Sequence, residues 1–257
     1  MVGLIPPGAG PPELALAMAA ALLAGLVKGL VGFAMPMIMI SALSGFLPAG
    51  TALAGLILPA LVCNVWQAVR QGLGAALDSS RRFWRLLAAL AGGIVVSAPL
   101  VPILPERALL IVLGGPILAF ALSQLAGWHL SFAPVRQGRA EVLTGLIGGL
   151  FGGISGVWGP PVIALLLAMA AGKREMVRVQ GVVYLIGSIT LVPAHLASGV
   201  LSAATLPFSA ALAVPALAGM ALGLAVQDRI APAPFRRATL LVLAIAALNL
   251  LRRGAGL

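Results

Sequence analysis

The sequence predicts an all-α, multi-pass membrane protein made of two inverted repeats, each with a broken or re-entrant helical hairpin and three spanning helices. Apolar types make up 61% of the residues and charged types 9%, and the mean hydropathy is +1.13. Soluble domains carry roughly 25% charged residues, so this composition excludes an ordinary soluble domain. Apolar runs of about 20 residues recur along the chain, each long enough to cross a bilayer as a helix. Ala, Leu and Gly dominate these runs, which favours helices over the alternating strands of a membrane barrel.

Two glycine-rich segments indicate an internal repeat. They read GLVKGLVGFAMP over residues 25–36 and GLFGGISGVWGP over residues 149–160. At a constant offset of 124 residues, Gly25 matches Gly149, Gly29 matches Gly153, Gly32 matches Gly156 and Pro36 matches Pro160. We therefore expect a first membrane repeat over residues 1–127, a cytoplasmic connecting loop over 128–140, and a second, inverted repeat over 141–257.

Each repeat is expected to begin with a hairpin that enters the membrane and returns to the same side. In the first repeat the hairpin covers Leu14–Leu47, and the spans that follow are Thr51–Arg70, Phe83–Leu104 and Ala108–Ala126. In the second repeat the hairpin covers Glu141–Ala171, and the spans are Met176–Leu196, Leu206–Val226 and Ala238–Leu251. This layout starts the two repeats on opposite sides of the membrane, as in many secondary transporters.

The basic residues support this topology. Twelve of the sixteen Lys and Arg residues fall in four loops: Arg70, Arg81, Arg82 and Arg85; Arg136 and Arg139; Lys173, Arg174 and Arg178; and Arg229, Arg236 and Arg237. The hairpin layout places all four loops on one side, which the positive-inside rule makes cytoplasmic. The net charge of +10 therefore reflects topology and does not indicate nucleic-acid binding. We expect the chain to lie in the lipid bilayer of a bacterial inner membrane.

Each glycine-rich segment ends at a proline that begins a second apolar helix. The residue before a proline is disfavoured in a helix, whereas a proline suits the first helical turn. We therefore expect the chain to unwind at Phe33–Met35 and at Val157–Gly159. Two helix N-termini meeting there near the membrane midplane would offer free N–H groups and partial positive charge to an anion. The alternative is a pair of proline kinks with close glycine packing between helices.

Lys28 is the one charged residue well inside an expected span. Burying an ammonium there is costly, so it predicts a site for an anionic substrate, unless the long side chain reaches the interface. The polar residues of the spans near the breaks are further candidates, although each could instead link helices. His195 is expected at the membrane interface. The candidate substrate-binding residues are Lys28, Gly32, Phe33, Ala34, Pro36, Asn64, Gln67, Ser155, Gly156, Trp158, Pro160, Gln180, Tyr184 and Ser188.

The sequence offers no support for catalysis, a metal site or a cofactor. One Cys and two distant His residues give no ligand spacing, and no nucleophile–base motif occurs. All six acidic residues lie at expected span ends or in loops, so no carboxylate is placed for a proton relay or a sodium site. A negative cell interior favours anion exit by about 2.3 kcal/mol per charge per 100 mV, which favours export.

At the two glycine blocks the chain resembles the sulfite exporter TauE/SafE family, also called the toluene sulfonate uptake permeases. The resemblance rests on GLVKGLVGFAMP and GLFGGISGVWGP, the chain length and the layout in two halves. It implies a secondary transporter, working by alternating access, for a small sulfur-containing anion such as sulfite, sulfoacetate or another organosulfonate. It carries over no catalytic residues. A carrier or channel for another small organic anion, and a non-transporting membrane assembly protein, are the alternatives; the oligomeric state is left open.

Overall fold

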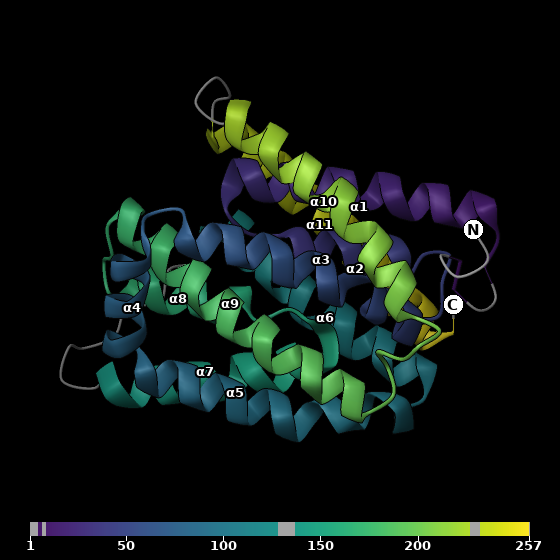
Figure 1. The fold of residues 1–257 in the computed structure, drawn as a ribbon, viewed down its shortest axis with the longest axis horizontal. Helices are drawn as coiled ribbons and strands as arrows, with labels where there is room; N and C mark the ends of the chain where they lie inside the picture. The colour runs from purple at the N-terminus through teal and green to yellow at the C-terminus, as the bar shows by residue number, and fades with distance from the viewer. Residues whose placement is uncertain (1–4, 7–8, 128–136, 227–231, 257) are drawn as a thin grey trace.

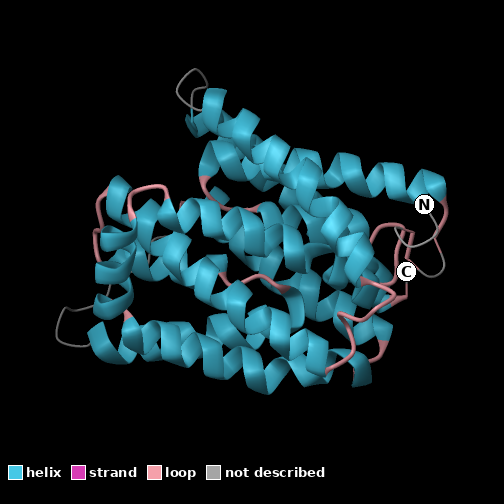
Figure 2. Cartoon of the chain, in the orientation of Figure 1, coloured by secondary structure: helices cyan, strands magenta, loops and turns pink. Residues whose placement is uncertain are grey.

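The computed structural model describes residues 5–6, 9–127, 137–226 and 232–256, and over these residues the chain is helical with no strand (Figures 1 and 2). In chain order the helices are α1 (Pro11–Val31), α2 (Met35–Leu43), α3 (Ala49–Val69), α4 (Leu73–Arg82), α5 (Trp84–Ser97), the 3₁₀ helix η1 (Ala98–Ile103), α6 (Glu106–Leu125), α7 (Gln137–Ser155), α8 (Gly159–Ala168), α9 (Lys173–Ala197), α10 (Leu206–Val226) and α11 (Pro232–Ala255). The expected all-α class is confirmed.

Seven segments of the described chain are long and apolar enough to cross a membrane. They are α1, α3, α5 with η1, α6, α9, α10 and α11. The sequence predicted six spans and two hairpins. The seventh is α1, the first arm of the first hairpin, whose 21 residues extend about 31 Å as a helix. Its second arm, α2, has only nine residues, so the two arms of this hairpin are unequal.

A short helix, α4, stands where the sequence predicted a loop. Figure 1 shows it at one end of the bundle, running across the direction of the spanning helices. Ser79 on its buried face contacts α9, where Arg178 Nε donates a hydrogen bond of 2.9 Å to Ser79 Oγ. Leu73 and Leu77, one turn apart, are exposed on another face. With ten residues and a polar C-terminal half, α4 is too short and too polar to cross the membrane.

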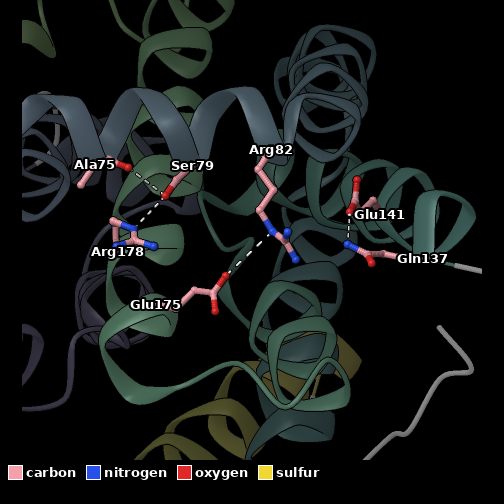
Figure 3. A network of polar contacts seen from close by, with 7 residues as sticks. All are labelled: Ala75, Ser79, Arg82, Gln137, Glu141, Glu175 and Arg178. Atoms are coloured by element: carbon pink, nitrogen blue, oxygen red, sulfur yellow. Dashed lines mark hydrogen bonds and ion pairs between the residues drawn. The ribbon is translucent and has the colours of Figure 1, made fainter.

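Polar and charged residues from three helices, α4, α7 and α9, gather at this end of the bundle, as Figure 3 shows. Arg82 of α4 lies 3.9 Å from Glu175 of α9, and Gln137 Nε2 donates to Glu141 Oε1 within α7 at 2.9 Å. At the opposite end, Arg253 Nη1 donates to the carbonyl oxygen of Ser44, and the Ala49 N–H donates to Glu106 Oε1 at 2.8 Å. Of the four predicted basic loops, residues 128–136 and 227–231 lie outside the described residues.

Two pairs of helices pack at backbone distance through glycines. In the first pair, α1 lies on α10: a methyl group at Gly25 or Gly29 would overlap the carbonyl oxygen of Ala216 or Met220. From Gly25 to Gly29 the facing residue on α10 advances from Ala216 to Gly223, so α1 and α10 run parallel. Small residues allow this approach between membrane helices. Gly25 and Gly29, predicted from the repeat, therefore serve helix packing.

The second pair, α7 on α5, has the same character. Methyl groups at Gly145 and Gly149 would overlap the carbonyl oxygens of Leu86 and Leu90, and one at Gly93 would lie 2.9 Å from the backbone nitrogen of Leu150. The facing residues advance together, so α7 and α5 also run parallel. At the offset of 124 residues, α1 corresponds to α7 and α10 to α5. Each of these pairs joins a helix of one half to a helix of the other.

The core between these pairs contains α3 and α9, which cross in opposite directions. Asn64 Nδ2 donates to Ser188 Oγ at 2.8 Å, whereas further along α3 the backbone at Gln67 and Ala68 faces Gly181, seven residues before Ser188. A methyl group at Gly181 would lie 3.1 Å from the Ala68 Cα atom. The crossing places polar residues of α3 and α9 beside the end of α1.

The side on which the basic end lies can be tested with single cysteines. We expect Asp78→Cys, on the exposed surface of α4, to react with a membrane-impermeant thiol reagent only from the cytoplasmic side. Ala203→Cys, exposed in the loop before α10, is expected to react only from the other side. The measurement is labelling in right-side-out and inside-out vesicles. The single native cysteine, Cys63, is buried and gives the unlabelled background. Labelling of both positions from one side would contradict this topology.

Candidate functional site

Two helix breaks lie next to the α3–α9 crossing. The first falls between α1 and α2, where Gly32 and Ala34 have φ values of +83° and +75°. The second falls between α7 and α8, where Gly156 has φ +69°. Glycine adopts this left-handed conformation freely, whereas for Ala34 the same conformation costs about 1–2 kcal/mol of conformational energy. Both breaks lie one residue earlier than the sequence predicted, at residues 32–34 and 156–158.

The two helices that restart after the breaks differ in their N-terminal donors. Pro36 is the second residue of α2, so the N–H groups of Met35 and Met37 remain in its first turn. In α8 the second and third residues are both proline, so Gly159 carries the only N–H among the first three residues. Proline has no N–H, and the unpaired donors of a first turn are what an anion binds. The second break is therefore a poor anion site from backbone donors alone.

Lys28 lies in the last turn of α1 and is 2% exposed, so its side chain does not reach the surface. Its Nζ donates to Asn64 Oδ1 at 2.7 Å and lies 5.3 Å from the centre of the Tyr184 ring. Among the described residues, no carboxylate lies within ion-pair distance of this ammonium. The helix C-terminus and the aromatic ring both favour a cation. Neither carries a full negative charge, so the ammonium has no counter-charge among the described residues.

Asn64 holds α1 and α9 together at the level of Lys28. Its Oδ1 accepts from Lys28, while its Nδ2 donates to the Tyr184 carbonyl oxygen at 3.1 Å and to Ser188 Oγ at 2.8 Å. Because Lys28 can only donate and a carbonyl can only accept, these contacts fix the orientation of the amide. The Asn64–Ser188 bond joins two residues that are 124 positions apart, which is the offset of the glycine blocks.

One turn further, Gln67 closes the end of α1. Its Nε2 donates to the Gly32 carbonyl oxygen at 3.0 Å, and Gln180, also buried, approaches Gly32 from α9. Two polar atoms of this cluster, Gln67 Oε1 and Tyr184 Oη, are buried without a hydrogen-bond partner among the described residues. The Tyr184 hydroxyl would lie 2.8 Å from a methyl group at Gly159, which places it at the N-terminus of α8. A buried hydroxyl without a partner is costly, so it is available to a ligand.

Comparison with known protein families shows which family this chain belongs to. The family model described as sulfite exporter TauE/SafE matches residues 17–250. The chain belongs to the TauE/SafE family. The match includes both breaks and the whole polar cluster from Lys28 to Ser188, and it confirms the resemblance seen at the glycine blocks. Members of this family are membrane transporters, and the chain is a multi-pass transporter of this kind. Neither the curated proteins nor the solved structures yielded a match.

Several predicted site residues have structural contacts in this TauE/SafE chain. The Phe33 ring packs edge-on against Phe120, with ring centres 6.0 Å apart and an interplanar angle of 87°. Ser155 donates to the Phe151 carbonyl at 2.6 Å and accepts from the Val157 N–H at 3.0 Å, so it stabilises the end of α7. Trp158 is buried against glycines of α7 and α9. Ala34, Gly156, Pro36 and Pro160 shape the breaks.

His195, which is expected at the membrane interface, lies two residues before the end of α9 and is covered by α7. The side chain is fully buried, with Nε2 2.8 Å from the Gly153 carbonyl oxygen and Nδ1 3.2 Å from Ser198 Oγ. The imidazole thereby ties the outer part of α9 to α7 next to a glycine of the second block. Position along a helix indicated its depth, but it did not indicate which face α7 covers.

Sequence reasoning missed the glycines of α9. Gly181 lets α9 approach the α3 backbone, and Gly187 accommodates the Trp158 indole, which would lie 2.9 Å from a methyl group there. A signal was present, since a glycine inside a helix is less favourable than alanine and marks close packing when it occurs. Cys63 on α3, directly before Asn64, is fully buried as well. By the offset of 124 residues, Cys63 corresponds to Gly187.

Proposed function

We propose that this transporter is a carrier for a small sulfur-containing anion, such as sulfite, sulfoacetate or another organosulfonate, and that it works as an exporter. The observation that carries the proposal is the buried Lys28 ammonium, which has an amide and a ring as partners but no carboxylate within the described chain. A buried charge with no counter-charge is expensive, and an anionic substrate would compensate it. Membership of the TauE/SafE family supports a sulfur oxyanion as that substrate.

In the proposed complex, the anion lies between the Lys28 ammonium, the Tyr184 hydroxyl and the N-terminus of α8. Lys28 supplies the charge, and Tyr184 donates a hydrogen bond from an atom that has no other partner among the described residues. Asn64, Gln67, Gln180 and Ser188 position these groups, since they link α1, α3 and α9 around them. The α8 terminus contributes little besides the Gly159 N–H, because the two prolines that follow Gly159 have no N–H to donate.

We further propose that the halves, residues 1–127 and 141–257, are inverted repeats that move against each other in alternating access. Three contacts support this arrangement. The pairs α1–α10 and α7–α5 correspond at the offset of 124 residues, and both are parallel. The α3–α9 pair is antiparallel and is joined through Asn64 and Ser188, which are themselves a corresponding pair. A pseudo-two-fold axis through that hydrogen bond would relate the halves, and the substrate would bind beside it.

The proposed direction is export from a bacterial cell across its inner membrane. Of the acidic residues, Glu141 is buried but pairs with Gln137 at the basic end, and Glu106 accepts a backbone N–H at the opposite end. Neither lies in the cluster around Lys28. An anion leaving a cell with a negative interior gains about 2.3 kcal/mol per charge per 100 mV, so export needs no coupled carboxylate.

The test is transport by the purified full-length chain in proteoliposomes. We expect saturable movement of radiolabelled sulfite or methanesulfonate, faster when the imposed potential drives the anion in the direction of flow and slower when the potential is reversed. Unlabelled substrate on the opposite side is expected to accelerate exchange, because a carrier returns loaded. Saturation without such counterflow would indicate a channel. If correctly inserted protein moves neither anion, the carrier proposal for sulfur anions is wrong.

A further inference from the structure

The two halves differ most at three corresponding positions around the breaks. Lys28 corresponds to Gly152, Cys63 to Gly187 and Ala34 to Trp158. The first half thus has two larger side chains and one methyl group, whereas the second has two glycines and an indole. The exchange is reciprocal: where one half is bulky, the other is small.

The reason in the second half is direct contact with the indole. Trp158 is 1% exposed, and a methyl group at Gly152 would lie 2.6 Å from its Cε3 atom. A methyl group at Gly187 would lie 2.9 Å from its Cε2 atom. Both distances are shorter than a carbon–carbon contact allows, so neither position accepts a side chain while Trp158 is present. The indole therefore fills the place in the second half where a counterpart of Lys28 would stand.

This packing leaves the site with one full positive charge. At the first break the C-terminus of α1 meets the N-terminus of α2, and at the second the C-terminus of α7 meets the N-terminus of α8. A helix C-terminus carries a partial negative charge and an N-terminus a partial positive charge of similar size, so the two offset each other at each break. The Lys28 ammonium is the remaining charge of the cluster.

Resting on the proposed function, we propose that the site accepts one monovalent anion and that Trp158 is the residue that sets this specificity, by excluding a second cation. One ammonium neutralises one negative charge. The second charge of a dianion would be desolvated with no partner, which is costly in a buried site. Within the sulfur anions, hydrogen sulfite and monosulfonates fit this site, and a sulfonate that also carries a carboxylate does not. This specificity thus narrows the proposed substrates and removes sulfoacetate from them.

The first test compares isethionate (2-hydroxyethanesulfonate) with sulfoacetate in proteoliposomes of the native chain, with the membrane potential clamped to zero. Both have a two-carbon backbone and a sulfonate, but isethionate ends in a hydroxyl and sulfoacetate in a second anionic group. We expect the ratio of initial rate to KM to favour isethionate at least about tenfold. Equal transport of the two anions, or a preference for sulfoacetate, would overturn the inference while leaving the carrier proposal intact. Transport of neither would instead count against the carrier proposal.

The second test builds the missing cation. Trp158→Ala opens the space, and Gly152→Lys places an ammonium there; we expect the double variant to shift the ratio toward sulfoacetate by at least about tenfold. The matched control, Trp158→Ala with Gly152→Gln, opens the same space with a neutral side chain and is expected to keep the preference for isethionate. Because the readout is a ratio, a lower yield of active protein does not change it. If both double variants are folded and show the same ratio, Trp158 does not set the charge specificity and the inference fails.

Discussion

Replacing Lys28 by glutamine is expected to reduce anion transport by about 100-fold, because the substrate loses the one full positive charge of the cluster around it. Glutamine can still donate to Asn64 Oδ1, so the link between α1 and α3 remains possible and the change isolates the charge. The measurement is the initial rate of sulfite or methanesulfonate uptake into proteoliposomes, normalised to the amount of monodisperse protein. Lys28→Arg, which keeps the charge, is expected to retain measurable transport.

A matched control removes a cation elsewhere. Arg82 is exposed at the basic end and lies 3.9 Å from Glu175, where solvent screens the pair. Arg82→Gln is therefore expected to leave the transport rate within about a factor of two, since exposed ion pairs contribute little. Full transport by Lys28→Gln, in protein of native thermal stability, would remove Lys28 from the site and with it the main support for the anion proposal.

Two adjacent glycines of α5 are expected to differ strongly in their tolerance of a side chain. Gly93 faces α7, where a methyl group would lie 2.9 Å from the Leu150 nitrogen and 3.0 Å from the Gly149 Cα atom. Gly92 has open space around the same position. Gly93→Leu must push the α5 and α7 backbones apart and is expected to destabilise the protein by more than about 3 kcal/mol. Gly92→Leu is expected to change the stability by less than about 1 kcal/mol.

The measurement for this pair is the free energy of unfolding in mixed detergent micelles, together with elution as a single species in size-exclusion chromatography. The two variants add the same side chain to neighbouring positions of one helix, so the change in hydrophobicity is the same in both. Similar stability of the two variants would show that the close α5–α7 contact does not hold the native fold together.

Much of the fold follows from the sequence because the bilayer restricts the choices. Length and apolar content predicted the spans, and the prolines at 36 and 160 predicted where helices restart to within one residue. Which helices pack against each other was harder to predict from the sequence. The spacing of Gly25 and Gly29 indicated a face for close packing, but any helix with a small-residue face would fit it, and the choice of α10 emerges only in three dimensions. The surface helix α4 has no apolar run of span length and was read as a loop.

The candidate cluster was predictable in its members more than in its contacts. Helical spacing placed Asn64 and Gln67 on one face of α3, and Tyr184 and Ser188 on one face of α9, and the structure brings these faces together around Lys28. Whether Lys28 was buried or reached the interface depended on what covered the end of α1. Phe33 and Ser155 were chosen for their nearness to the breaks, yet they pack or bond locally, since neighbours in sequence point to different sides of a break.

The pairing of α1 with α10 and of α5 with α7 also has a consequence for the order in which the helices can pack during synthesis. The glycine face of α1 is synthesised first, but the helix that covers it, α10, leaves the ribosome only after nine further helices of the described chain. In the same way, the surface of α5 that packs on α7 is covered only after α7 has been synthesised. The first half therefore enters the membrane with two unfilled helix surfaces and completes its packing only when the second half arrives. We therefore expect the assembly of this transporter in the bilayer to be completed late, once both α7 and α10 have been inserted.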